Sequence, residues 1–581
     1  MKDILQFFTI FTNQQKKGFV LIFIIMFLGA VLEAVGIGAI LPLISLMGQP
    51  NFLQENPDIS PIIHGFGITN HEELIIFCSI LLMVFYLIKN VYITWEMYVQ
   101  RRFAKEMQCL YAKEIFTTYL AKPYIYHINT NSAKLLRDVN ACASVLFNNI
   151  LMPIMGLVSE LITALAIWIM LVAVDAITAT VVAVIMVVII LSIIRSFRKR
   201  IVQQGAIQND ASVEYFKWIN QGLGAIKETK ILGKERFFLS SFIDAYEKYA
   251  RASQVYLLLS DIPRIIVELF VVIALLSLIV FKIIIGEAPV NIVPVLGVLA
   301  MAAFRLMPSA NRIVSYYNSA KNQMPFFYEM RDVLLDIKKR LLLGDKEILP
   351  DHSRKKLHFS NKLRVEDVSF RYTENSDLIL DGVSFELLKG GFIGIIGPSG
   401  AGKTTFVDIL LGLLRPTEGK IMCDGQDINA DIMAWQANLA YVPQDIYLTD
   451  STIKENIALG ELYEDIDDEL LKRVLDMSEL SDYVKALPDG IDTFVGERGA
   501  KISGGQRQRI GIARALYQKP EVLILDEATS ALDNETEKAI TDTILKLKGK
   551  ITIIAIAHRV STLEQCDYKI KLENGKAEII Y

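Results

Sequence analysis

Long apolar runs fill the first half of the chain, and short runs that alternate with polar residues fill the second half. Six apolar runs, at about 18–47, 74–97, 147–174, 176–195, 263–285 and 290–310, each reach the roughly 20 residues that a helix needs to cross a bilayer. Between 149 and 194 the only charges are Glu160 and Asp175, and we place Asp175 at the turn between the third and fourth runs. The pattern predicts a helical membrane domain with six spans in residues 1–335.

Lysine and arginine are distributed unevenly between the segments that join these runs. Segment 48–73 has neither residue, whereas segment 98–144 holds seven and segment 196–262 begins with the basic run RSFRKR. Because segments rich in Lys and Arg stay in the cytoplasm, the two long segments and both termini are predicted to be cytoplasmic. Both segments have few Pro or Gly, so the membrane helices should continue below the bilayer and turn near AKPYIYHINTNSAK and NQGLGAIKETK. These tips could dock on a cytoplasmic domain or form ordinary loops.

Composition supports a membrane protein with a soluble part. The chain has 581 residues, 52% hydrophobic and 21% charged, so it is too long for one domain and too apolar for an ordinary soluble protein. A formal net charge of −4 gives no reason to expect nucleic acid as a partner. The five cysteines show neither CxxC spacing nor a cluster, which argues against disulfides and a structural metal. The first apolar run is too long for a signal peptide, so we expect a retained span.

The second half reads as a charged linker, 336–362, followed by an α/β domain, 363–581, in which short β-rich runs alternate with helical patterns. Within it, FIGIIGPSGAGKTTFVDILLGLL has the order strand, glycine-rich turn, helix, and Gly397 to Thr404 fit GxxxxGK[ST]. Backbone N–H groups of such a loop cradle phosphates, and its lysine, here Lys403, reaches the β- and γ-phosphates. Thr404 is in the position to bind Mg²⁺.

A second motif, EVLILDEATSALD, is an apolar strand that ends in two carboxylates. Asp526, at the strand end, can hold Mg²⁺ directly or through water, and Glu527 can polarise an attacking water molecule. Two adjacent acids are weak evidence alone, because strand ends are often polar. Downstream of a phosphate-binding loop they predict a nucleotide hydrolase.

With these motifs in place, ISGGQRQRIGIARAL resembles the signature of ATP-binding-cassette (ABC) ATPases, with Ile502 where leucine is commoner. YVPQD resembles the family's Q-loop, SALD its D-loop and AIAHR its switch, and SFRYTENS offers an aromatic that would stack on adenine. The resemblance implies catalytic roles for Glu527, His558 and Gln444, and Mg²⁺ binding by Thr404, Gln444 and Asp526. It implies ATP binding by Tyr372, Gly397, Pro398, Ser399, Gly400, Ala401, Gly402, Lys403, Thr404, Thr405, Asp526, Ser503, Gly504, Gly505, Gln506 and Asp533.

The resemblance extends to the whole chain through the six-span layout. It implies a six-span exporter domain followed by an α/β P-loop ATPase domain of the ABC type, with ATP and Mg²⁺ as cofactors and residence in a bacterial cytoplasmic (inner) membrane. In this family ATP is held between Lys403 of one copy and Ser503 of the other, so a chain with one membrane half and one ATPase half works as a pair. Because the motifs are intact, a homodimer is favoured over an asymmetric heterodimer. The alternative from a different functional class is an ATP-gated channel or regulatory protein, in which nucleotide binding rather than turnover would matter. The intact Glu527 argues against this alternative.

Cations in the apolar runs bear on the cargo. Lys89 and Arg305 each lie about fifteen residues from the outer end of a span, which at 1.5 Å per residue is roughly 22 Å down a core of about 30 Å. Arg264 lies near the inner start of the fifth span, and Arg312, at or below the inner interface, is the weaker candidate. Intramembrane cations are costly and usually face protein or water. If they line a cavity, phosphate is the anion that suits them, whereas an amphipathic drug would want aromatics or carboxylates.

Structural readings of the same cations stay open. Lys89 and Arg264 could extend their charges to the inner interface. Arg264 could also pair with Glu268 at i, i+4. Arg305 could pair with Glu160 or Glu33.

A narrower resemblance concerns the membrane domain. FRLMPSANRI, with IPRIIVE before it, is similar to bacterial flippases of polyprenyl-diphosphate-linked oligosaccharides. These flippases carry a short external helix after the first span, for which segment 51–72 is long enough. The resemblance implies that an anionic lipid-linked oligosaccharide is moved from the inner to the outer leaflet for protein or surface glycosylation. The alternative is a multidrug or lipid A type exporter.

Overall fold

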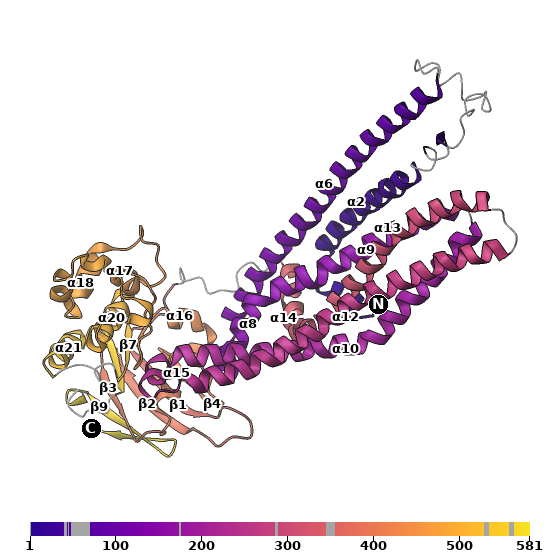
Figure 1. Cartoon of the computed structure of the whole chain (residues 1–581). Coiled ribbons are helices and arrows are strands. Elements are labelled where there is room, and N and C mark those ends of the chain that lie inside the picture. Colours follow the sequence, from indigo (N-terminus) through magenta and orange to yellow (C-terminus); the bar gives the residue numbers. More distant parts are fainter. Residues whose placement is uncertain are drawn as a thin grey trace. The chain divides into compact units, whose positions relative to one another are not determined.

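The computed structural model of the chain describes residues 2–39, 43, 46–47, 70–172, 176–284, 289–343, 355–527, 534–556 and 563–581 (Figure 1). It divides into two compact units. The helical unit comprises Met1–Lys122 and Asn129–Leu349, and the α/β unit comprises Pro123–Ile128 and Pro350–Tyr581.

Long helices make up the helical unit, as the apolar periodicity predicts. In chain order the elements are α1 (Lys2–Phe7), η1 (Phe8–Ile10), α2 (Asn13–Gly38), α6 (His71–Leu120), α7 (Tyr124–Asn129), α8 (Ser132–Ser144), η2 (Val145–Leu151), α9 (Met152–Val172), α10 (Ala176–Gly224), α11 (Ile226–Ile231), α12 (Glu235–Ile284), α13 (Pro289–Asn322) and α14 (Met324–Leu343). α7 is the exception in this order, because most of it groups with the α/β unit.

The membrane spans lie on helices that are much longer than a bilayer is thick. Within the described part of the chain, Asn13–Gly36, His71–Leu120 and Ser132–Val172 are each long and apolar enough to cross a membrane. The remaining predicted spans, 176–195, 263–285 and 290–310, lie on α10, α12 and α13. α6 has 50 residues, or about 75 Å at 1.5 Å per residue, against about 30 Å of hydrocarbon. The prediction that spans continue as helices beyond the bilayer is therefore confirmed. The predicted external helix at 51–72 and the turn at Asp175 fall almost wholly outside the described residues.

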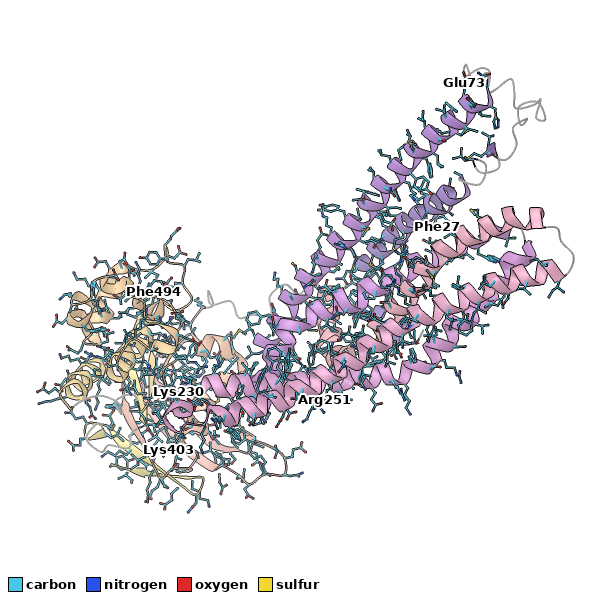
Figure 2. The ribbon with its side chains drawn as sticks, in the orientation of Figure 1. Phe27, Glu73, Lys230, Arg251, Lys403 and Phe494 are labelled. Atoms are coloured by element: carbon cyan, nitrogen blue, oxygen red, sulfur yellow. The ribbon has the colours of Figure 1, made fainter. Side chains whose placement is uncertain are left out.

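Apolar side chains on the outside of these helices suit a lipid environment. Leu87 on α6 and Leu191 on α10 are 67% and 60% exposed, and Phe27 on α2 projects outward among similar side chains (Figure 2). Glu73 lies at the start of α6, whereas Lys230 and Arg251 lie toward the opposite end of the helical unit (Figure 2). Basic residues thus lie beyond the apolar middle of the helical unit, at the end opposite Glu73, and the orientation in the membrane stays a prediction.

Glycines let α2 pack closely against α6. A Cβ atom on Gly29 would lie 2.0 Å from Oε2 of Glu96, and one on Gly36 would lie 3.5 Å from Cδ of Lys89. Both charged side chains are buried, at 6% and 8% exposure, because the missing side chains leave room for them. Small residues commonly serve this purpose where membrane helices approach each other. The packing therefore places ionisable groups inside the helical unit.

One predicted boundary is corrected by α14. The predicted linker begins at 336, but α14 continues to Leu343. Leu334 and Ile337 are fully buried, and Arg340 forms an ion pair with Glu114 of α6 at 3.3 Å. The charged run KKR, at 338–340, suggests a loop, but it lies on α14, whose other face is packed against the helical unit.

A buried network of charges joins α8, α10 and α14. Arg137 and Asp138 are 2% and 1% exposed and form an ion pair. Arg137 also contacts Glu329 at 3.0 Å, and Glu329 accepts hydrogen bonds from Lys134 and Asn209. Burial alone would raise the pKa of Glu329, but the hydrogen bonds from Asn209, Lys134 and Arg137 lower it to about 2. Each buried charge in this network therefore depends on the other members for its ion pairs and hydrogen bonds.

We expect Arg137→Ala to destabilise the helical unit by about 3–5 kcal/mol, because it leaves the buried Asp138 without its cation. The thermal unfolding temperature of the detergent-solubilised chain measures the effect. Arg102→Ala is the matched control, since Arg102 pairs with Glu106 only on the exposed surface. Equal unfolding temperatures for the two variants would contradict a structural role for the network.

Two sheets form the α/β unit. The antiparallel sheet has the order β2-β1-β4-β5, and the second has the order β10-β9-β3-β8-β7-β6, in which β9, β3, β8, β7 and β6 run parallel. The strands are β1 (Lys362–Phe370), β2 (Leu380–Leu388), β3 (Phe392–Ile396), β4 (Glu418–Cys423), β5 (Gln426–Asp427), β6 (Leu439–Val442), β7 (Val522–Asp526), β8 (Thr552–Ile556), β9 (Tyr568–Glu573) and β10 (Lys576–Ile580).

Helices and apolar clusters complete this unit. The helices are α15 (Lys403–Leu410), η3 (Ile428–Ala430), α16 (Ile432–Gln436), α17 (Ile453–Ile457), α18 (Asp468–Met477), α19 (Ser481–Lys485), η4 (Gly490–Asp492), η5 (Glu497–Gly499), α20 (Gly504–Tyr517) and α21 (Asn534–Leu547). One cluster surrounds the fully buried Trp435, and another joins α17, α18 and α20 to the parallel sheet. Figure 1 shows α17, α18 and α20 grouped at one end of the unit and β1, β2 and β4 at the other.

One of the two predicted turns belongs to the α/β unit. Pro123–Ile128 follows α6 in sequence, but it groups with Pro350–Tyr581. Ile125 packs against the apolar cluster around Trp435. That this tip is a docking point for the cytoplasmic domain stays a prediction. Docking of the second tip, at α11, stays a prediction.

Candidate functional site

The predicted nucleotide residues gather because the strands that carry them are parallel. β3 leads into the phosphate loop, β6 ends two residues before Gln444, and β7 ends at Asp526. All three belong to the parallel part of one sheet, in the order β3-β8-β7-β6. The carboxyl ends of parallel strands share an edge, which is where α/β folds bind ligands. The sheet therefore brings three separate motifs to one place.

The loop between β3 and α15 has the backbone that phosphate binding requires. Gly400 and Gly402 have φ angles of 82° and 90°, a left-handed conformation that favours glycine. A Cβ atom on Gly397 would lie 2.3 Å from the carbonyl oxygen of Leu572, so no side chain fits there. Pro398, Ser399 and Gly400 are exposed on the rim of the loop, with Ala401 buried beneath them. The loop thus presents its backbone rather than side chains.

Lys403 lies within this loop. Its Nζ atom donates hydrogen bonds to the carbonyl oxygens of Gly397 and Pro398, at 2.8 and 2.9 Å. The next residue, Thr404, is exposed at the first turn of α15. Thr405 is buried and its hydroxyl lies 3.2 Å from the hydroxyl of Tyr372. Tyr372, 38% exposed, therefore lies beside the loop, in reach of a bound nucleotide.

Asp526, Glu527 and Gln444 lie together at the ends of β7 and β6. Gln444 donates a hydrogen bond from Nε2 to Oε2 of Glu527 at 2.8 Å. Asp526 is 7% exposed and accepts a hydrogen bond from the hydroxyl of Tyr441 at 3.2 Å. Glu527 has a φ of 50°, which is uncommon for a residue with a side chain. Such backbone strain is typical of functional sites.

The signature residues start a helix and are accessible. Ser503 is the N-cap of α20: its hydroxyl accepts from the backbone N–H of Gln506, and the side chain of Gln506 accepts from the N–H of Ser503 at 2.8 Å. Ser503 and Gly504 are exposed, and Gly505 is partly so. The N-terminus of a 14-residue helix attracts anions. This surface can therefore meet a phosphate group presented from outside the chain.

Two residues of this site have no role in the sequence-based prediction. Asp408 on α15 is 8% exposed, and burial together with the charge of Asp526 raises its pKa to about 6. Burial and Asp526 also raise the pKa of Tyr441. A signal for Asp408 exists, since it is the one polar residue in the apolar run FVDILLGLL. Asp533 and His558, both predicted, lie outside the described residues.

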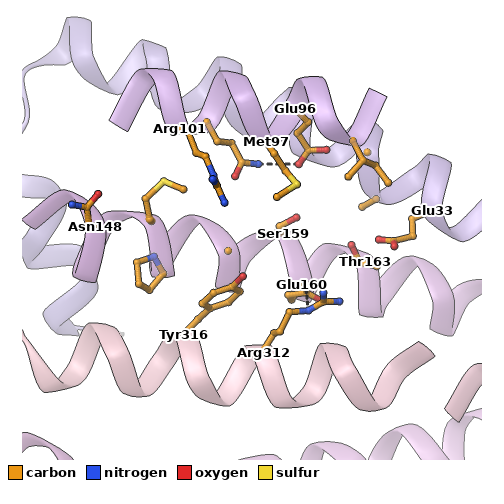
Figure 3. Close-up of a pocket in the computed structure, with 17 residues that line it drawn as sticks. Glu33, Glu96, Met97, Arg101, Asn148, Ser159, Glu160, Thr163, Arg312 and Tyr316 are labelled. Atoms are coloured by element: carbon orange, nitrogen blue, oxygen red, sulfur yellow. Dashed lines mark hydrogen bonds and ion pairs between the residues drawn. The ribbon is translucent and has the colours of Figure 1, made fainter. Parts of the chain in front are cut away.

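The helical unit contains a cavity of about 350 Å³ that is lined by α2, α6, α9 and α13 (Figure 3). Its charged and aromatic lining residues are Glu33, Glu96, Arg101, Glu160, Arg312 and Tyr316. Three carboxylates thus face two arginines. Arg312 pairs with Glu160 at 2.7 Å between Nε and Oε1.

The three predicted substrate cations whose side chains the structure describes, Lys89, Arg264 and Arg312, are not gathered in this cavity. Of these, Arg312 lines it, although it is the weakest candidate by sequence. Lys89 is buried with Nζ 4.2 Å from the ring centroid of Tyr86, and Arg264 is exposed. The predicted pair of Arg264 with Glu268 is absent among the ion pairs of the described residues, and the side chain of Arg305 lies outside them. Glu160, a proposed partner for Arg305, pairs with Arg312 in the described structure.

Part of the α/β unit matches a known protein family. Residues 380–530 match the family model described as ABC transporter. An ATP-dependent lipid A-core flippase of Ralstonia nicotianae is 42% identical over 216 residues, which are 37% of this chain and 36% of the flippase. An ABC multidrug transporter of Aspergillus fumigatus is 38% identical over 232 residues, 40% of this chain and 17% of the transporter. The chain thus matches about a third or less of the length of these two relatives.

The whole chain has a structural counterpart. The structure of a bacterial Atm1-family ABC exporter with ATP bound superposes with a TM-score of 0.75 at 22% identity, covering 98% of this chain and 96% of the exporter chain. The likeness extends over both the helical and the α/β parts and shows the fold. Residues 380–530 therefore belong to an ATPase domain of the ABC transporter family, carried by a chain that has the fold of an ABC exporter.

Proposed function

We propose that the chain hydrolyses ATP and uses the free energy to export an amphipathic molecule across a bacterial cytoplasmic membrane. The observation that supports this most directly is the convergence of Lys403, Asp526 and the Gln444–Glu527 pair at one edge of one sheet. This set contains a phosphate-binding group, a carboxylate for a metal ion and a candidate base. The exporter fold of the remaining chain gives the hydrolysis a transport role.

The residues present fit ATP and Mg²⁺. The exposed backbone of 398–400 and the ammonium group of Lys403 would hold the phosphates, and the ring of Tyr372 would stack on the base. Thr404, Gln444 and Asp526 would hold Mg²⁺, which neutralises charge on the phosphates when bound. Glu527 would accept a proton from the attacking water, with its carboxylate oriented by Gln444 at 2.8 Å. His558 would contact the γ-phosphate, and Asp533 would contribute from the D-loop.

The working assembly is a homodimer with both termini in the cytoplasm. Ser503, Gly504 and Gly505 form an exposed helix start that can face a nucleotide held by Lys403 of a second copy. Gln506 supports this start through its hydrogen bond to Ser503. Basic segments at the ends of α6 and α10 favour the cytoplasmic side for the same end of the helical unit.

For the cargo, we propose a multidrug or lipid A type substrate, and the lining of the cavity favours the multidrug type, because lipid A carries phosphate groups. Carboxylates of Glu33, Glu96 and Glu160 and the ring of Tyr316 line it, and one of its two arginines is paired with Glu160. Carboxylates and aromatic rings suit amphipathic molecules, whereas unpaired cations suit phosphates. The relatives named as a lipid A-core flippase and a multidrug transporter support this class of cargo, and they match 37% and 40% of this chain.

A lipid-linked oligosaccharide is the second candidate cargo. FRLMPSANRI and IPRIIVE, which resemble flippases of polyprenyl-diphosphate-linked saccharides, favour it. Lys89, Arg264 and Arg305 would then bind the diphosphate in a state in which they face the transport path.

Reconstitution in vesicles tests both cargoes. We expect ATP-dependent movement of an amphipathic dye without phosphate groups, and slower or no movement of a lipid A-like lipid or a fluorescent diphosphate-linked saccharide. If the saccharide is moved faster, and Arg305→Ala reduces its movement more than it reduces basal ATPase activity, the ranking of the two cargoes is reversed. Movement of none of the three while ATP is hydrolysed would contradict export of these classes.

A further inference from the structure

We infer that the cavity between α2, α6, α9 and α13 binds the ammonium group of its cargo at Glu96. This inference rests on the proposed export function and names the chemical class of the cargo. It is carried by the burial of Glu96, by its partners and by the groups that surround it in the cavity.

Glu96 is a buried carboxylate that lacks a cation. It is 6% exposed and lines the cavity. Among the described residues its hydrogen-bond partner is Gln100, whose Nε2 donates to Oε1 at 2.9 Å, and no ion pair to it is found there. A neutral amide satisfies one oxygen but leaves the charge uncompensated. Isolated carboxylates in such places are costly, so an intramembrane acid of this kind marks a binding site.

The other charges of the cavity do not supply the missing cation. Arg312 is engaged with Glu160, and the second oxygen of Glu160 is buried without a hydrogen-bond partner in the described structure. Arg101 is exposed, where solvent and salt screen its charge. Glu33 adds a third carboxylate to the lining. In Figure 3, Glu96 and Arg101 extend from one helix and Arg312 and Tyr316 from another, toward the same space along α9.

Two glycines shape the wall for a cation. A Cβ atom on Gly29 would lie 2.0 Å from Oε2 of Glu96. Because glycine lacks this atom, the carboxylate can lie directly against the backbone of α2. On the opposite side, a Cβ atom on Gly156 would lie 2.5 Å from the ring of Tyr316, so that ring rests against α9. A carboxylate and an aromatic ring facing one cavity are the groups that recognise an alkylammonium ion.

The volume and the apolar lining set the size of the ligand. About 350 Å³ is at the lower end of the range of small-molecule sites, enough for a head group and the start of a chain. Ile93, Met97 and Met152 offer apolar contacts to that chain. A phosphate group would instead lie beside Glu96 and Glu33, and such like-charge contacts are strongly unfavourable.

Equilibrium binding to the full chain in lipid nanodiscs, without nucleotide, tests the inference. The probe is radiolabelled hexadecyltrimethylammonium, with hexadecanol and hexadecyl phosphate as competitors and empty nanodiscs as the blank. We expect Glu96→Gln to weaken specific binding at least about thirtyfold, because it removes the charge and keeps the shape. Glu268→Gln on α12, exposed and away from the cavity lining, should change binding less than about twofold.

A second variant covers the case in which Glu96→Gln does not fold. Tyr316→Leu should weaken binding of the ammonium probe about fivefold through loss of the ring. Unchanged binding in both variants, or competition by hexadecyl phosphate as strong as by the unlabelled ammonium compound, would overturn the inference. ATPase activity of the wild-type chain is measured in the same samples. Its absence with normal binding would contradict the export function and leave the ammonium site standing.

Discussion

Replacement of Glu527 by Gln should lower ATP turnover at least about a hundredfold, because it removes the candidate base. Nucleotide binding should persist, since the glycine loop and Lys403 are untouched and a glutamine can still accept the hydrogen bond from Gln444. Phosphate release measures turnover, and a fluorescent ATP analogue measures binding. Turnover close to that of the wild type would remove the role assigned to Glu527.

A matched control for this variant lies at the opposite end of the same strand. Glu521 precedes β7 and pairs with Lys389 at 3.0 Å on the partly exposed surface. Glu521→Gln makes the same chemical change and should leave turnover within about twofold, because surface ion pairs contribute little. A large loss in the control would show that turnover is sensitive to the stability of the sheet rather than to the catalytic carboxylate.

Mixed dimers should restore activity that neither parent variant has. We expect Lys403→Ala and Ser503→Arg each to abolish ATP turnover as homodimers, because each damages both sites. In a dimer of one copy of each, one site carries both defects and the other carries none. Co-expression should therefore recover up to about a quarter of wild-type turnover if subunits pair at random and sites act independently.

Separate tags on the two variants allow the mixed dimer to be purified and its turnover measured directly. Recovery shows that one nucleotide site uses Lys403 from one copy and Ser503 from the other. No recovery, with mixed dimers present in the sample, would contradict the shared site. If each nucleotide site were formed within one chain, every site in the mixed dimer would carry one defect and no turnover would be recovered. Recovery therefore distinguishes a shared site from a site within one chain.

The nucleotide site is largely predictable from sequence because its chemistry is local. The run from Gly397 to Thr404 carries its own turn and helix start, and the strand before Asp526 is apolar along its whole length. The contact between Glu527 and Gln444 follows from the fold, because the strands that precede them, β7 and β6, are parallel neighbours. Asp408 stands out in the sequence as the one polar residue of an apolar run, but its closeness to Asp526 depends on how α15 packs against the sheet.

The cavity was not predictable to the same degree. Depth along a span can be counted from the sequence, and this reasoning selected Lys89, Arg264 and Arg305. Which side of a helix faces a cavity depends on lateral packing, and the packing placed Arg312, the weaker candidate, there together with Glu33 and Glu96, which the depth argument does not select. The α14 boundary was misjudged for a related reason, since charged residues on the outer face of a packed helix look like loop when read one by one.

Gly29 and Gly156 have a further consequence. Neither has a functional group, yet each holds the space that a carboxylate or a ring occupies in the cavity wall. One added methyl group at either position would displace the recognition group without touching the cargo itself. Cargo preference in this chain can therefore change through substitutions at residues that bind nothing, and a search for specificity determinants limited to polar positions would overlook them.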